Sequence, residues 1–255
     1  MEIRNSVVVV TGGASGIGAA LCRRFHEDGA AHVAVVDVAA DAAAVVANEV
    51  GGSAHSVDVG DAAAVATMID AVERDAGPID LYCSNAGIVR TGGVETAPAA
   101  WDQSWAVNVL AHQHACNVLV PRWIERGGGH LLITASAAGL LTQLGSLSYS
   151  VTKHAAVAYG EWLAITHGDD GVGVSILCPQ GVRTPLVASV RGEAVLVDDL
   201  IEPEALAAVV SAGLADDDLL ILPHPEVAEY VRRRGADPAR WVAGMRRLWA
   251  RTKPG

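Results

Sequence analysis

The sequence predicts an α/β fold with a doubly wound parallel sheet of about seven strands and helices on both faces. Short runs rich in Val, Ile and Leu alternate with longer alanine-rich stretches of helical spacing. The strand candidates are almost continuously apolar, which is typical of strands covered on both faces. The 255 residues, of which 51% are hydrophobic, are enough for a single domain over residues 1–255 with a packed core.

The predicted elements follow in a regular order. The predicted strands are residues 6–10, 32–36, 54–58, 81–84, 130–134, 173–178 and 219–222. Gly29 ends the first predicted helix, and a Gly-Pro pair at 77–78 precedes the fourth strand. Residues 184–202 have weak periodicity and are expected to form a mobile substrate loop before a helix that begins near Pro203. Residues 223–255 are expected to form a C-terminal helical extension.

The charge balance argues against polyanionic partners. The formal net charge is −11, which opposes non-specific binding to nucleic acid or to an anionic membrane. No apolar run approaches the ~20 residues of a membrane span, and we expect no signal peptide before the first strand. The four cysteines form no CxxC pair and are expected to be reduced and buried. We therefore expect a cytoplasmic protein that binds neither nucleic acid nor membrane.

A glycine-rich turn, TGGASGIG at residues 11–18, follows the first strand and opens a helix. Glycine allows the positive φ of a tight turn and lets backbone amides approach a pyrophosphate at the positive end of the helix. A turn without a ligand is the alternative, but the strand before it and the helix after it favour dinucleotide binding. The residues expected at the dinucleotide are Gly12, Ser15, Gly16, Ile17 and Gly18.

An acidic residue, Asp37, ends the second strand nineteen residues beyond Gly18. There a carboxylate can accept hydrogen bonds from both ribose hydroxyls of the adenosine, and it would repel a 2′-phosphate. No Lys or Arg occurs at 13–15 or soon after Asp37 to pair with that phosphate. The sequence therefore predicts NAD rather than NADP. The alternative is that Asp37 only caps the helix near Asp41.

The most informative chemistry lies in Ser136 and, thirteen residues later, Tyr149 with Lys153 four positions beyond it. In a helix, Tyr149 and Lys153 leave the same face one turn apart. An ammonium group near the phenol lowers its pKa from about 10 toward the working pH, so the tyrosine can act as a general acid or base. Ser136, at the end of the fifth strand, can hydrogen-bond the substrate oxygen. The Tyr–Lys spacing alone is common on helix surfaces, so the other motifs decide its meaning.

The glycine turn, Asp37, Ser136 and the Tyr149–Lys153 pair together resemble the short-chain dehydrogenase/reductase family in its shorter form, over residues 6–185. The resemblance implies a Rossmann fold and an NAD-dependent alcohol dehydrogenase or carbonyl reductase. Hydride transfer would interconvert a secondary alcohol and a ketone. Tyr149 would take the hydroxyl proton, Ser136 would hold the oxygen, and Lys153 would also grip the nicotinamide ribose.

The resemblance implies further site residues. Asn108 matches the family's helix asparagine, whose backbone carbonyl binds a water that links the lysine to bulk solvent. The other implied cofactor residues are Asp58 and Val59 at the adenine, Asn85, Ala86 and Gly87 in the groove, and Pro179, Val182 and Thr184 at the carboxamide.

Several positions depart from the family pattern. Ser84 and Ala111 replace a usual asparagine and a frequent glycine. Ala135 replaces the serine that commonly precedes the catalytic one, which leaves Ser136 as the catalytic serine. Gln180 stands where glycine usually follows the proline. It is expected to touch the substrate, or else Gly181 serves as the turn glycine in a shifted register.

Two further positions carry open alternatives. Gln143 precedes Tyr149 and is expected either to line the substrate pocket or to be exposed. His112 and His114 are expected on an exposed or interfacial face, and no HExxH spacing indicates a metal.

The tail after residue 222 departs most, with apolar residues and arginines at helical spacing. Its large apolar residues are Tyr230, Trp241, Met245, Leu248 and Trp249. Ordinary packing or subunit contact is the favoured interpretation, because an amphipathic helix usually buries its stripe on the core. The alternatives are a cover over the substrate mouth and a membrane-surface helix. The family uses helices at 98–121 and 149–167 for subunit contacts, so the resemblance implies a homo-oligomer, a tetramer or dimer.

Other functions remain open. One is an NADP-linked carbonyl reductase, another a sugar-nucleotide epimerase or dehydratase, and a third a non-catalytic NAD(H)-binding sensor. The joint presence of the proposed catalytic residues argues against the sensor. These residues are Asn108, Ser136, Tyr149 and Lys153. The substrate alcohol or ketone is not encoded in any motif.

Overall fold

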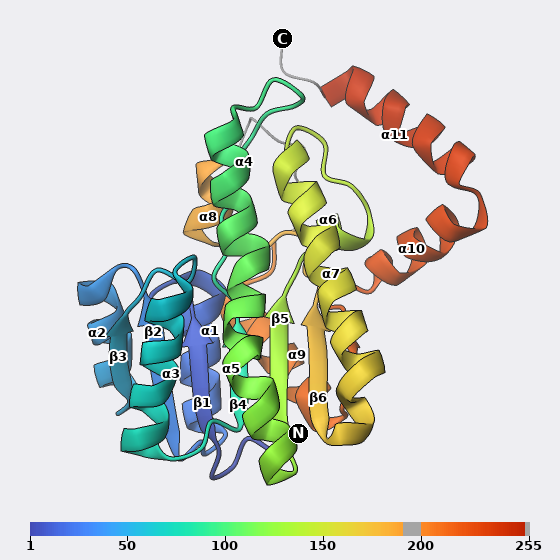
Figure 1. Cartoon of the computed structure of the whole chain (residues 1–255). Coiled ribbons are helices and arrows are strands. Elements are labelled where there is room, and N and C mark those ends of the chain that lie inside the picture. Colours follow the sequence, from blue (N-terminus) through green and yellow to red (C-terminus); the bar gives the residue numbers. More distant parts are fainter. Residues whose placement is uncertain (191–199, 253–255) are drawn as a thin grey trace.

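A parallel sheet of seven strands in the order β3-β2-β1-β4-β5-β6-β7 forms the middle of the molecule (Figure 1). The computed structural model describes residues 1–190 and 200–252. The strands are β1 (Val7–Thr11), β2 (His32–Asp37), β3 (Ser53–Ser56), β4 (Leu81–Ser84), β5 (Gly129–Thr134), β6 (Val172–Leu177) and β7 (Leu220–Ile221). The predicted fold class is therefore confirmed, and each predicted strand is found within one or two residues of its expected ends.

Helices cover both faces of the sheet. One face carries α1 (Gly16–Glu27), α2 (Ala40–Glu49) and α9 (Pro203–Ala215), and the other carries α3 (Ala62–Ala76), α5 (Ala111–Arg126) and α7 (Leu147–His167). Successive residues of a strand point to opposite faces. Val7 and Val9 accordingly lie in one hydrophobic cluster and Val8 and Val10 in the other. This two-sided burial explains the unbroken apolar runs of the sequence.

The strand order reverses between β1 and β4, and this positions the site. β1 pairs with β2 on one side and with β4 on the other, so the chain leaves the two strands toward opposite faces. Such a switch point opens a crevice at the carboxyl ends of the strands. Thr11 bridges the strands across it, because its hydroxyl donates to the Cys83 carbonyl at 3.1 Å and accepts from the Asn85 amide at 2.9 Å.

The helix predicted over 98–121 is interrupted. It consists of α4 (Pro98–Trp105), a π-helical segment η1 (Ala106–Leu110) and α5, which continues past Pro121 to Arg126. The remaining helices are α6 (Ala137–Leu140), η2 (Gly168–Asp170), α8 (Pro185–Ser189), α10 (Glu226–Ala236) and α11 (Pro238–Thr252). Within the predicted loop 184–202, Thr184 caps α8, and residues 191–199 of that prediction lie outside the described residues.

The tail forms a bent arm of α10 and α11 at the end of the molecule that carries α4 and α6 (Figure 1). Val227 of α10 is fully buried, and Arg234 donates a hydrogen bond to the Leu140 carbonyl at the end of α6. α11 itself has no buried residue, and its most extensive contacts are with α10. No helix in the described part of the chain is both long and apolar enough to cross a membrane.

Candidate active site

The glycine turn packs tightly between β1 and α1. Gly12 and Gly16 have φ angles of 65° and 52°, which favour glycine. A Cβ at Gly18 would lie 2.1 Å from the Gly12 carbonyl oxygen, so no larger residue fits. The N-cap residue of α1, Ser15, makes no side-chain capping bond, and the first turn carries no acidic residue. The amides at this helix end are therefore available to an anionic group.

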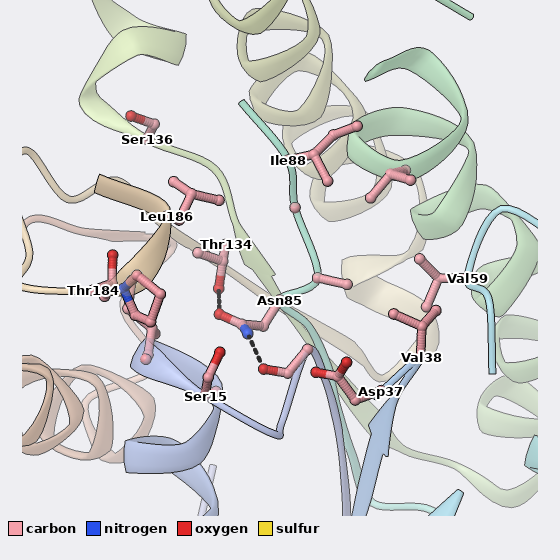
Figure 2. A pocket seen from close by; sticks show the side chains of 18 of the residues that line it. Ser15, Asp37, Val38, Val59, Asn85, Ile88, Thr134, Ser136, Thr184 and Leu186 are labelled. Carbon is pink, nitrogen blue, oxygen red and sulfur yellow. Dashed lines mark hydrogen bonds between the residues drawn. The ribbon is translucent and has the colours of Figure 1, made fainter. Parts of the chain in front are cut away.

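A cavity of about 560 Å³, here called the long cavity, runs along the carboxyl ends of the strands from Asp37 to Lys153. Every residue that the sequence predicted at the cofactor lines it. Figure 2 shows Ser15, Asp37, Val59 and Thr184 around this one space, although they come from different elements. The long cavity thus brings together segments that are far apart in the chain.

Asn85 fixes the centre of the long cavity. Its side-chain oxygen accepts from the Thr134 hydroxyl at 3.0 Å (Figure 2). Its amide donates to the Thr11 carbonyl at 2.9 Å. The Asn85 side chain therefore connects the end of β5 to the glycine turn and fixes the position of these two segments relative to each other.

Asp37 is half-buried at the far end of the long cavity. Its carboxylate accepts from the Ala14 amide at 3.2 Å and the Ala39 amide at 3.0 Å. The N-cap residue of α2 is Ala39, so Asp37 is not that residue, although one carboxylate oxygen holds the Ala39 amide. Among the described residues that line the long cavity, Lys153 is the sole cationic side chain.

Tyr149 and Lys153 lie at the opposite end, on one face of α7. The Lys153 Nζ is 5.7 Å from the centre of the Tyr149 ring and donates to the Thr134 carbonyl at 2.7 Å. Lys153 is only 3% exposed, and burial lowers the pKa of its ammonium to about 8. Burial also raises the pKa of the Tyr149 phenol, an effect that the Ser136 hydroxyl partly offsets. The expected lowering of the phenol pKa is thus corrected: the pKa of Tyr149 is raised, and burial is the largest cause.

Ser136 is placed by the end of β5 and the start of α6. Its hydroxyl accepts from the Ala138 amide at 3.1 Å and donates to the Pro179 carbonyl at 3.4 Å. The side chain therefore caps α6 and is fixed against the segment after β6. It lines the cavity beside Tyr149, as the sequence predicted.

Asn108 lies in the π-helix η1, fully buried behind the cavity wall. Its side chain accepts from the Ile88 amide and donates to the Ile88 carbonyl, both at 2.9 Å, and donates to the Thr152 hydroxyl at 3.1 Å. A Cβ at Gly87 would lie 3.3 Å from the Lys153 Nζ and 3.5 Å from the Asn108 Oδ1. The Asn108 and Lys153 side chains therefore both lie close to Gly87, and Asn108 approaches it from behind the cavity wall. π-Helical turns are frequent at functional sites.

His112 corrects the expectation of an exposed face. Its ring is fully buried, with Nδ1 2.6 Å from the Ser84 hydroxyl and Nε2 without a partner among the described residues. Burial, with a smaller contribution from Lys153, lowers the pKa of His112 to about 3. His114 is half-buried and its Nδ1 donates to the Val59 carbonyl at 3.1 Å. No described group of His, Cys, Asp and Glu could hold a metal.

His112→Gln is expected to weaken the acid sensitivity of the fold. Between pH 6.5 and about 3 the unfolded chain binds a proton at His112 that the folded protein does not accept, so stability is lost as pH falls. From about pH 7 to about pH 5 this amounts to about 2 kcal/mol. Denaturant unfolding of the parent and the variant at both pH values measures it. His26→Gln, at an exposed histidine, should behave as the parent, and an unchanged pH dependence in His112→Gln would contradict the prediction.

A second cavity of about 390 Å³, here called the side cavity, opens beside the long cavity. The residues that line both are Ser136, Tyr149, Gln180, Leu186 and Val187. Gln143 also lines the side cavity, so the structure brings both predicted substrate glutamines to it.

His224, which the sequence did not indicate, fixes the Gln180 turn. Its Nδ1 accepts from the Gln180 amide, and its Nε2 donates to the Gly181 carbonyl, each at 3.2 Å. A histidine between two prolines gave no signal of this role, because the partners lie 43 and 44 residues earlier.

The C-terminal arm supplies the outer wall of the side cavity. Its lining residues are Tyr230, Trp241, Met245 and Leu248. The favoured interpretation of the tail is ordinary packing or subunit contact. Packing on the core does not describe α11, because its apolar face is turned to a cavity, whereas subunit contact stays a prediction. The sequence predicted the apolar positions of the tail, but it did not show what those side chains face.

Known proteins similar to this chain were found by sequence and by structure. The family model described as short chain dehydrogenase matches residues 6–194. The 1-deoxy-11-beta-hydroxypentalenate dehydrogenase of Streptomyces exfoliatus is 33% identical over 255 residues, which cover 95% of this chain and 92% of that protein. The D-threitol dehydrogenase of Mycolicibacterium smegmatis is 35% identical over 191 residues, 72% and 73% of the two chains. A Burkholderia phymatum short chain dehydrogenase/reductase, solved in complex with NAD, has a TM-score of 0.84 at 27% identity and covers 93% and 95%.

Proposed function

Because the chain belongs to the short-chain dehydrogenase/reductase family, we propose that it is an NAD-dependent enzyme that interconverts a secondary alcohol and a ketone. The observation that carries this proposal is one cavity with Asp37 at one end and Ser136, Tyr149 and Lys153 at the other. Relatives named as dehydrogenases of different alcohols support the reaction class.

The residues of the long cavity fit a nicotinamide dinucleotide. The uncapped start of α1 would hold the pyrophosphate, and Asp37 the adenosine ribose. Asp58 and Val59 would lie at the adenine. The residues proposed along the groove and at the nicotinamide end are Asn85, Ala86, Gly87, Lys153, Pro179, Val182 and Thr184. When bound, NAD supplies the acceptor for the hydride of the alcohol.

The chain's own groups would then handle the proton. The Tyr149 Oη would take the proton of the substrate hydroxyl, while the Ser136 hydroxyl donates to the same oxygen. Lys153, with a pKa of about 8, is mostly cationic at neutral pH and would stabilise the phenolate. Asn108 would hold a water at its backbone carbonyl and connect Lys153 to solvent. Reduction of the ketone uses the same groups in reverse.

Asp37→Ala is expected to shift the cofactor preference from NAD toward NADP. The variant loses charged acceptors for the ribose hydroxyls and a charge that repels a 2′-phosphate. We expect the ratio of kcat/KM for NAD over NADP to fall by about 10-fold to 100-fold. Steady-state rates with both cofactors measure it, with Asp41→Ala, at an exposed acid on α2, as the control. An unchanged ratio would remove the basis for the NAD assignment.

The alternatives give different results in one screen. Parent protein is offered a panel of secondary alcohols with NAD or NADP, and reduced cofactor is followed by absorbance. Faster turnover with NADP would favour the NADP-linked reductase. Tight NADH binding without any turnover would favour the non-catalytic sensor.

We also propose a cytoplasmic homo-oligomer, a tetramer or dimer, built on a single catalytic domain. Large apolar side chains are exposed on α4 and α7, the helices expected at subunit contacts. They are Trp105, Val151, Trp162 and Ile165, the last 83% exposed. Four free, buried cysteines support a reducing compartment. Light scattering of the purified protein gives the subunit number.

A further inference from the structure

We propose that the side cavity binds a secondary alcohol or ketone with a bulky, uncharged hydrocarbon skeleton, and that the α10–α11 arm selects it. The proposal rests on the dehydrogenase function above. It adds the class of substrate and the segment of the chain that recognises it.

The position of the side cavity makes it the space for the substrate skeleton. It meets the long cavity at Ser136 and Tyr149, the two side chains proposed at the reacting oxygen. A carbinol carbon held there would leave the rest of its molecule in the side cavity. Gln180 stands at the same junction, and His224 fixes the backbone of its turn.

The size of the side cavity argues for a bulky substrate. Its volume of about 390 Å³ falls in the range of about 300–1,000 Å³ that is typical of sites for drug-sized ligands. A four-carbon alcohol would leave most of this space to water or empty, so it would gain little binding energy from the walls.

The chemistry of the walls argues for hydrocarbon. No charged side chain lines the side cavity in the described part of the chain, and its polar side chains beyond the reaction centre are Thr142, Gln143 and Gln180. The other walls are aliphatic or aromatic, from α6, α8 and the arm. Burying a charge without a partner is costly, so the part of the substrate in this space is uncharged.

The arm adds to the argument, because the described residues only half-bury the large apolar side chains of α11 that line the side cavity. Trp241, Met245 and Leu248 lie one turn apart on α11 and face the cavity, whereas Val242 on the same helix is 55% exposed. Trp241 packs beside the ring of Tyr230, 6.2 Å between centroids, and forms an aromatic wall with it. An apolar stripe is stabilised only when apolar surface covers it, and here a hydrocarbon skeleton would do so.

The first test compares substrates. With parent protein and NAD, we expect kcat/KM for the fused bicyclic decahydro-2-naphthol to exceed that for 2-butanol by at least about 100-fold. Faster turnover of 2-butanol, or of the anionic 3-hydroxybutyrate, would overturn the inference and leave the dehydrogenase function standing. If no alcohol is turned over with either cofactor, calorimetry with the NADH-bound protein decides. Binding of decahydro-2-naphthol then upholds the side cavity while the proposed reaction fails, and no binding overturns the inference too.

The second test uses matched variants of α11. Trp241→Ala should lower kcat/KM for decahydro-2-naphthol by about 10-fold to 100-fold, mainly through KM, while 2-butanol and NADH binding change little. Trp249→Ala, at a half-buried tryptophan that does not line the cavity, should change neither. Leu248→Asp should be equally harmful for the bulky alcohol, and Val242→Asp harmless.

Two results of the second test would overturn the proposal. Equal losses for the small and the bulky alcohol would assign Trp241 a structural role. A change in subunit number by light scattering without a change in KM would make the stripe a contact between copies of the chain.

Discussion

Tyr149→Phe is expected to lower kcat for alcohol oxidation by about 1,000-fold, because it removes the group that would take the hydroxyl proton. The ring, its packing and the Lys153 ammonium remain, so NADH binding should change little. Stopped-flow measurement with saturating NAD isolates the chemical step from cofactor release. A rate within a few-fold of the parent would show that another group moves the proton.

A matched control lies on the same helix. Tyr159→Phe removes a half-buried phenol whose ring lies 6.3 Å from that of His112 and outside both cavities. It should keep the parent's rate. The pH profile gives a second readout: oxidation requires the phenolate, and the pKa of Tyr149 is raised by burial, so the parent's rate should rise with pH on the alkaline side. Tyr149→Phe should lose that rise.

Lys153→Met is expected to abolish most of the activity and yet to stabilise the fold at about pH 7 by about 2 kcal/mol. Burial lowers the pKa of Lys153 from 10.5 to about 8. The folded protein therefore carries a buried cation that is more stable in the unfolded chain, a cost of about 3 kcal/mol. The buried Thr134 carbonyl would be left without the Lys153 donor, which offsets this gain by about 1 kcal/mol.

The sign of the pH dependence follows from the same shift. Between about pH 8 and pH 10.5 the unfolded chain keeps the Lys153 proton while the folded protein has released it. The free energy of unfolding of the parent should therefore gain from this group as pH rises through that window. Denaturant unfolding of the parent and Lys153→Met at about pH 7 and about pH 10 measures the difference. A variant less stable than the parent at about pH 7 would contradict a desolvated cation at this site.

The sheet and the cofactor end could be predicted because their signals are local. Unbroken apolar runs mark two-sided strands, and the glycine turn carries its own backbone requirement, as the 2.1 Å approach at Gly18 shows. The position of Asp37 in the site could likewise be predicted, because it stands at the end of a strand. These features depend on residues that are neighbours in the sequence.

The features that the sequence missed depend on distant partners. Nothing near His112 in the sequence distinguishes a buried ring from an exposed one, because two of its contacts, Ser84 and Tyr159, are distant in the chain. The π-helix around Asn108 coincides with bonds to Ile88 and Thr152, which no local pattern encodes. An amphipathic stripe in the tail predicts an apolar contact, but it does not say whether protein or substrate provides it.

The π-helical segment Ala106–Leu110 joins α4 and α5 into one continuous helix. It changes the direction in which the side chains of α4 point relative to those of α5. Each residue of an α-helix advances the chain by about 100°, so a one-residue deletion within these five positions would turn all of α4 by that angle against α5. Gln103, which lines the long cavity, would leave it, whereas Trp123 would keep its place in the core. Insertion or deletion of one residue in this segment would therefore change which α4 side chains line the long cavity without disturbing the sheet. Substitutions cannot produce this kind of variation.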